Sequence, residues 1–97
     1  MKIWGIIRKE NKIRRDVVLE FPIERPDSVD GWAEIIGEFA REFDLSRPVV
    51  LSKHVRDLVT FGHTAFRAAD FMESIDFDRF EIEIFPEKSK HADPYHA

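Results

Sequence analysis

The chain of 97 residues contains no cysteine, which excludes disulfide bonds, thiolate nucleophiles and thiolate ligands for a metal. It has only 4 glycines, and none of them belongs to the glycine-rich loop that holds phosphate groups in nucleotide-binding proteins. It also lacks a nucleophile elbow and any histidine spacing typical of a zinc site. No motif in this sequence therefore identifies an enzyme by itself.

Long hydrophobic runs are also missing. The longest apolar runs, around 17–19 and 48–51, are much shorter than the roughly 18 residues needed to span a membrane. The first five residues lack the apolar core and small-residue cleavage site of a signal peptide. We therefore expect no transmembrane helix, no membrane partner and a cytoplasmic location.

The residues that are present predict a folded domain. Hydrophobic residues make up 43% of the chain and charged residues 35%, values typical of globular proteins. The length predicts a single domain over 1–86. Residues 87–97 show no periodic apolar face and are expected to form a flexible tail.

Four strands are predicted. Residues 2–9 and 13–21 form an expected β-hairpin, in which Asn11 is the residue best suited to a left-handed turn. The apolar run 49–51 is expected to be an interior strand. From Phe80 onward apolar and acidic residues alternate, which predicts a last strand that points Phe80, Ile82 and Ile84 into the core.

Helical periodicity fills the space between these strands. A helix over about 30–43 is expected to begin at a cap formed by Ser28 or Asp30, and a second over 53–59 is expected to end at Gly62. A short helix is predicted over 67–74. The fold class is therefore α/β (α+β), with the hairpin and two further strands in a mixed four-stranded sheet and helices packed on one face. Helical crossovers would permit parallel neighbours.

The first strand carries apolar side chains on both faces. Ile3 and Ile7 share one face with Gly5, which leaves a notch that an aromatic ring from a helix is expected to fill. Trp4 and Ile6 lie on the other face, which suggests that another subunit or a partner covers it. With Phe61, they are the predicted interface residues.

Three short segments carry a resemblance to a family. These are Lys2-Ile3-Trp4-Gly5, Glu42-Phe43-Asp44-Leu45 and Ile75-Asp76-Phe77-Asp78. Together they resemble a family of small uncharacterised bacterial proteins over most of residues 1–85. The matching segments are a strand with a glycine, a helix end and a turn into a strand, so the resemblance implies no activity, ligand or site.

One run holds most of the chemically useful side chains: His54, Arg56, Asp57, His63 and Arg67. Imidazole titrates near neutrality, and guanidinium binds carboxylate or phosphate groups in a bidentate manner. His54 and Asp57 are three residues apart on the expected helix, so the carboxylate could orient the imidazole for acid-base chemistry. The alternative is that the run forms a solvated helix surface, which is the commoner role of such spacing.

The sequence gives less support to two further functions, metal binding and nucleic-acid binding. A metal site would use His54, Asp57 and His63, or in the tail His91, Asp93 and His96, but neither set matches a zinc motif. Nucleic acid would bind the basic hairpin residues Arg8, Lys9, Lys12, Arg14 and Arg15, with Trp4 or Phe61 stacking on bases. A net charge of −4 opposes this, and basic residues at a sheet edge also prevent edge-to-edge aggregation. We expect no metal and no cofactor.

The sequence therefore favours a small binding protein without catalysis, which associates with itself or with a protein partner. The alternative is an enzyme, or a protein that binds a small anion or phosphate-containing ligand, through His54, Arg56, His63 and Arg67. This alternative predicts that the four side chains converge on a concave pocket, whereas the binding-protein hypothesis predicts that they scatter over the surface.

Overall fold

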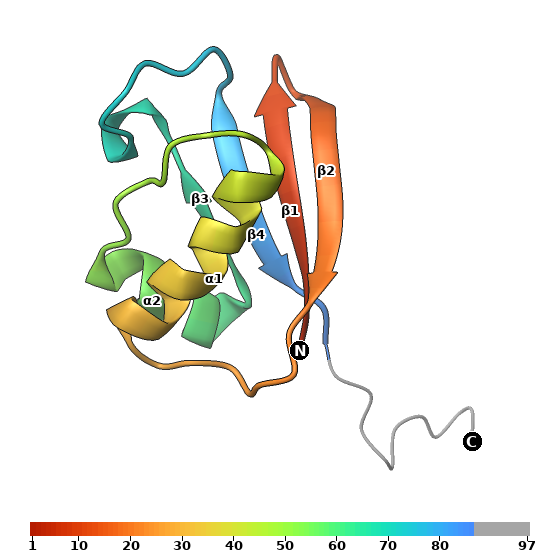
Figure 1. The fold of residues 1–97 in the computed structure, drawn as a ribbon, viewed down its shortest axis with the longest axis vertical. Coiled ribbons are helices and arrows are strands. Elements are labelled where there is room, and N and C mark those ends of the chain that lie inside the picture. The colour runs from red at the N-terminus through yellow and green to blue at the C-terminus, as the bar shows by residue number, and fades with distance from the viewer. Residues whose placement is uncertain (87–97) are drawn as a thin grey trace, which may run out of the picture.

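A computed structural model describes residues 1–86, which form a four-stranded sheet with two helices on one of its faces (Figure 1). The strands are β1 (Lys2–Lys9), β2 (Lys12–Glu20), β3 (His63–Phe66) and β4 (Arg79–Ile84). The helices are α1 (Val29–Glu42) and α2 (Ser52–Phe61), and a 3₁₀ turn spans Ala68–Asp70. The strand order is β2-β1-β4-β3, and every neighbouring pair is antiparallel. The predicted α+β class is confirmed.

The β1–β2 hairpin closes through a two-residue turn. Glu10 and Asn11 both adopt positive φ angles, 56° and 66°, as the tight turns that suit the twist of a hairpin require. The Glu10 N–H donates to the Asp78 carboxylate at 2.7 Å, so the start of β4 holds this turn in place. The left-handed conformation predicted for Asn11 is confirmed.

The core lies between the sheet and the helices. At its centre the ring of Phe39 on α1 fills the notch above Gly5, where a Cβ atom would come within 2.7 Å of the ring Cε1. The predicted filling of this notch by a helix aromatic is confirmed. The other large, fully buried side chains around it are Trp32, Phe66, Phe80, Ile3, Ile36, Leu58 and Ile82.

Specific polar contacts set the ends of α1. The Ser28 hydroxyl accepts a hydrogen bond from the Gly31 N–H at 3.1 Å, which satisfies one unpaired donor of the first turn. At the other end the Arg15 guanidinium donates to the Phe43 carbonyl at 2.8 Å and lies over the Phe43 ring. The helix predicted over 30–43 is confirmed, with Ser28 as its cap.

Two predicted elements are wrong. Residues 49–51 form a loop in which Val49 and Leu51 are 43% and 44% exposed, and the third strand is β3 instead. The segment 67–74 contains only the 3₁₀ turn at Ala68–Asp70. Loop 49–51 and this turn support each other, since the Val49 N–H donates to the Asp70 carbonyl at 2.7 Å. The backbone of the apolar run 49–51 is thus bonded to a turn later in the chain and not to a neighbouring strand.

The prediction of parallel neighbours is also wrong, because the chain reverses directly after α2. Gly62 ends the helix as predicted, with a φ of 80°, and its N–H donates to the Leu58 carbonyl at 3.0 Å. β3 starts at the next residue and pairs antiparallel with β4, so neither helix serves as a crossover between parallel strands.

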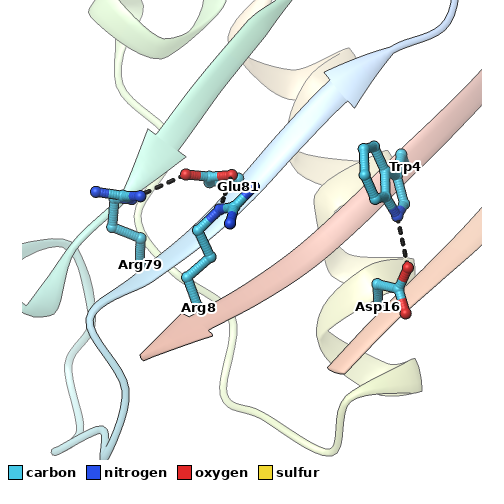
Figure 2. A network of polar contacts seen from close by, with 5 residues as sticks. All are labelled: Trp4, Arg8, Asp16, Arg79 and Glu81. Atoms are coloured by element: carbon cyan, nitrogen blue, oxygen red, sulfur yellow. Dashed lines mark hydrogen bonds and ion pairs between the residues drawn. The ribbon is translucent and has the colours of Figure 1, made fainter. Parts of the chain in front are cut away.

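The face of the sheet opposite the helices is covered by its own polar side chains (Figure 2). The Trp4 indole N–H donates to Asp16 at 2.8 Å, and the Glu81 carboxylate accepts from Arg8 and from Arg79, each at 2.8 Å. Ile6, on the same face of β1, is 1% exposed. The apolar second face of β1 is therefore largely covered within the protein itself.

No helix within residues 1–86 is long and apolar enough to span a membrane. The tail predicted over 87–97 lies outside the described residues.

Candidate functional site

A groove of about 710 Å³ runs along the free edge of β3, beside α2. It is lined by Lys53, His54, Asp57, Phe61, His63, Thr64, Ala65, Arg67, Glu81, Ile82 and Glu83. Among the predicted site residues, the structure brings together His54, Asp57, His63, Arg67 and Phe61. Arg56 instead lines a different hollow, with Asp27, Val55 and Val59, and Trp4 lies on the open face of the sheet. Three of the four side chains named for the ligand-binding alternative therefore line the same groove, namely His54, His63 and Arg67.

The groove exists because α2 folds back over β3. Gly62 reverses the chain between them, and the two elements then run in opposite directions. Halfway along, the Thr64 hydroxyl donates to the Asp57 carboxylate at 3.0 Å. Near the start of α2 the His54 ring lies 4.2 Å from the ring of Phe66. These two contacts fix the helix above the strand.

His54 is a structural residue of this site. It is 1% exposed, and its Nδ1 accepts the Leu51 N–H at 2.9 Å, so the proton of the neutral ring resides on Nε2. Among residues 1–86 Nε2 has no hydrogen-bond partner, and it lies 3.7 Å from the Asp70 carboxylate. Burial lowers the pKa of His54 below 6.5, and the Asp70 carboxylate opposes this shift. The surface location expected for this histidine is wrong.

The expected pairing of His54 with Asp57 is not formed. Asp57 accepts from Thr64 instead, and the carboxylate nearest to His54 is that of Asp70. The side chains that line the groove include no serine or cysteine, and their one hydroxyl group, on Thr64, is already bonded to Asp57. The groove residues therefore present no activated hydroxyl or thiol nucleophile.

The charges in the groove differ between its two ends. Lys53 and Arg67 lie at the end where α2 begins and β3 finishes. Phe61, His63 and Glu83 lie at the other end, where the Phe61 and His63 rings are 6.2 Å apart and His63 pairs with Glu83 across the sheet. We call the end with Lys53 and Arg67 the basic end, and the end with Glu83 the acidic end.

The groove has no excess of positive charge. Its lining holds two basic side chains, Lys53 and Arg67, and three acidic ones, Asp57, Glu81 and Glu83. Glu81 is already paired with Arg8 and Arg79. This balance disfavours a small polyanion, which would need the basic charges to dominate.

The floor of the groove includes backbone groups that have no partner in the described part of the chain, residues 1–86. The Gly62 carbonyl accepts the Ile84 N–H at 2.7 Å, and in the same register Thr64 pairs with Ile82 and Phe66 with Phe80. In an antiparallel pair alternate residues exchange hydrogen bonds with the neighbour. The N–H and C=O groups of His63 and Ala65 therefore point away from β4, into the groove.

The opposite edge of the sheet, β2, is protected. Its first half carries Lys12, Arg14 and Arg15 and is interrupted by a bulge opposite Ile7 and Arg8. Basic side chains and bulges both hinder the addition of another strand. The interpretation of these basic residues as protection of an edge thus fits their place in the fold.

Sequence reasoning missed the backbone component of the site. Thr64 and Ala65 received no role, because His63–Phe66 was not recognised as a strand. The only available signal was the alternation of Thr64 and Phe66, which are buried, with His63 and Ala65, which are not. Four residues are too few for a clear period-two pattern.

Within residues 1–86 no three histidine, aspartate or glutamate side chains gather as a set of metal ligands. The tail set His91, Asp93 and His96 lies outside the described residues.

No protein-family model, curated protein or solved structure matches the chain. Membership of the bacterial family that the sequence resembles stays a prediction.

Proposed function

We propose that this protein is a binding module without catalysis, and that the groove between α2 and β3 is where it holds a segment of another protein. The carrying observation is the edge of β3, which no strand within residues 1–86 covers. This edge opens into a groove with an aromatic side chain, Phe61, at 66% exposure. Exposed main-chain groups beside an exposed aromatic residue suit a polypeptide ligand, which offers both hydrogen bonds and apolar contacts.

The alternative, an enzyme or an anion-binding protein, is supported by His54, His63 and Arg67, which line one groove, but the other observations count against it. His54 is buried and its Nδ1 is occupied by the Leu51 N–H, so it is poorly placed to exchange protons with a substrate. Arg56 lies outside the groove, and the lining has more acidic than basic side chains. The proposal includes a cytoplasmic location, which the absence of cysteine favours.

Self-association is the second candidate, and we expect it only at the second half of β2, beyond the bulge and the basic side chains that protect the first half. Val18, in the straight second half of β2, is 47% exposed, and in Figure 1 this strand forms the sheet edge farther from both helices. A second copy could approach there without a collision between helices. The mass of the full chain in solution over a range of concentrations tests this candidate, and a monomer at millimolar concentration would contradict it.

A selection experiment tests the proposed function. Random ten-residue peptides displayed on phage are selected on the immobilised full chain, and the enriched peptides are synthesised. We expect them to shift the amide resonances of α2 and β3, and to bind Phe61→Ser more weakly. Phe85→Ser is the matched control, since Phe85 is a partly exposed aromatic residue that does not line the groove. If no peptide is enriched, or if the shifts map to another surface, the proposal is wrong.

A further inference from the structure

We infer that the bound segment is an extended chain that adds to β3 as a fifth strand, with an acidic side chain at the basic end of the groove and a basic one at the acidic end. This inference rests on the proposed function and names the partner of that site by its chemistry. Three features support it: the direction of the backbone groups of His63 and Ala65, the space left beside β3 by α2, and the charges at the two ends of the groove.

The backbone groups give the mode of binding. His63 and Ala65 each direct one N–H and one C=O away from β4, as the pairing of Gly62, Thr64 and Phe66 with β4 requires. An extended chain laid along β3 can satisfy all four groups, as in other complexes in which a peptide extends a sheet. Ala65 has a small side chain, so the middle of the strand is accessible from the open face.

The position of α2 excludes a second folded copy from this edge. The contacts of Asp57 with Thr64 and of His54 with Phe66 place α2 directly over β3. A second β3 would lie about 4.8 Å from the first and would bring its own α2 to a similar distance, whereas packed helices need about 8–10 Å. A segment without a covering helix meets no such obstacle.

The two sheet edges differ in a way that supports β3 as the partner-binding edge. β2 carries three basic side chains in its first half and a bulge, both of which hinder strand addition. β3 has neither feature. The residues whose backbone groups point to its free edge are His63 and Ala65, and its register with β4 runs without a shift. Its four residues limit the bound segment to a length of about 13 Å.

The charges give the segment its order. Within residues 1–86 neither Lys53 nor Arg67 forms an ion pair, and the Glu83 carboxylate at the other end forms none either. All strand pairs in this sheet are antiparallel, and we take the added strand to be so too. Its N-terminal end then lies beside Arg67, so the acidic residue precedes the basic one.

Three synthetic peptides serve as probes. The acid-first peptide is acetyl-Thr-Glu-Thr-Val-Thr-Lys-Val-amide, in which Glu, the central Val and Lys share one face of a strand. The base-first peptide exchanges Glu and Lys and is otherwise identical. A third peptide carries an N-methyl group on the central Val of the acid-first sequence, which removes a main-chain donor without changing any charge. Binding to the full chain is measured by amide resonance shifts.

Two proline variants test the backbone contacts. Ala65→Pro removes an N–H that the fold does not use, and Val18→Pro does the same at β2, because Val17 and Leu19 are the residues there that bond to β1. We expect Ala65→Pro and the N-methyl peptide each to weaken binding about tenfold. Val18→Pro should bind as the wild type does. Thermal unfolding of both variants confirms that they fold.

The charge order is tested with the same set. The acid-first peptide should bind about fivefold more tightly than the base-first peptide, as expected for two solvent-exposed ion pairs. Arg67→Glu combined with Glu83→Lys should reverse this preference.

The outcomes separate this inference from the proposed function. If peptides from the phage selection bind in the groove but Ala65→Pro leaves their affinity unchanged, strand addition is wrong while the binding module stands. Equal affinity of the two probe peptides would refute the charge order. A complete lack of peptide binding in both experiments would overturn the proposed function as well.

Discussion

The hydroxyl of Thr64 donates to the carboxylate of Asp57 at 3.0 Å, and this bond joins the middle of α2 to the middle of β3. Thr64 is buried and Asp57 is half-buried, so the bond is shielded from competition by water. It fixes the separation of the two elements that form the groove.

Thr64→Val is expected to lower the free energy of unfolding by about 1–2 kcal/mol, because it keeps the shape of the side chain but leaves the Asp57 carboxylate without its donor. Urea denaturation measures this change. Thr60→Val is the control, since Thr60 is an exposed residue of α2, the helix that carries Asp57, and its effect should be close to zero. Equal effects of the two substitutions would show that the bond contributes nothing.

Gly5→Ala is expected to destabilise the fold by about 1–3 kcal/mol, because the added methyl group overlaps the Phe39 ring. Phe39→Leu creates space at the same point, so the double variant should lose less stability than the sum of the two single variants. Gly62→Ala is the comparison: nothing lies within 4 Å of its Cβ position, and its cost of about 1 kcal/mol comes only from the positive φ. Phe39→Leu should not reduce that cost.

Much of the fold could be predicted from such local patterns. The hairpin, α1 with its Ser28 cap, the end of α2 at Gly62 and the inward side chains of β4 all follow from periodicity, turn residues and caps. β3 could not be predicted, because its four residues owe their conformation to pairing with β4, which is distant in sequence. The apolar run 49–51 was misleading for the same reason: it lacks a strand partner and bonds to Asp70.

The site was predictable only in its side chains. The chemistry of imidazole, carboxylate and guanidinium groups pointed to four side chains that do line one groove: His54, Asp57, His63 and Arg67. Their roles depend on burial and on tertiary partners: His54 bonds to the backbone of Leu51, and Asp57 bonds to Thr64. Neither partner could be identified from the spacing of residues along a helix.

Acidification is expected to weaken the fold through His54. Burial lowers its pKa below 6.5 in the folded protein, so the unfolded state binds a proton more readily. The contribution to stability is therefore present above pH 6.5 and is lost as the pH falls through the lower, folded-state value. The groups that face His54 are Asp70 and Asp57, which favour its charged form, and Lys53, which opposes it.

Urea denaturation between pH 5 and pH 8 tests this dependence. His54→Asn retains an acceptor for the Leu51 N–H but does not titrate, so its stability should fall less on acidification than that of the wild type. His63→Asn makes the same replacement at an exposed histidine and serves as the comparison. If His54→Asn loses as much stability in acid as the wild type does, the assignment to His54 is wrong.

The hairpin turn depends on Asp78. Its carboxylate accepts the Glu10 N–H at 2.7 Å, so Asp78→Ala should speed the hydrogen exchange of the Glu10 amide and lower stability by about 1 kcal/mol. Asp76→Ala removes an exposed carboxylate from the loop before β4, which also contains Asp78, and serves as the control. The contact would be unimportant if both variants exchanged the Glu10 amide at the wild-type rate.

The most direct test of strand addition is hydrogen exchange of individual amides in the full chain, with and without the acid-first peptide at saturation. In the free protein the His63 and Ala65 amides should exchange rapidly, like those of Asp16 and Val18 on β2, because none of them is paired within the sheet. In the complex the Ala65 and His63 amides should become protected while the β2 amides stay unchanged. A complex in which the Ala65 and His63 amides exchange as fast as in the free protein would contradict strand addition at β3.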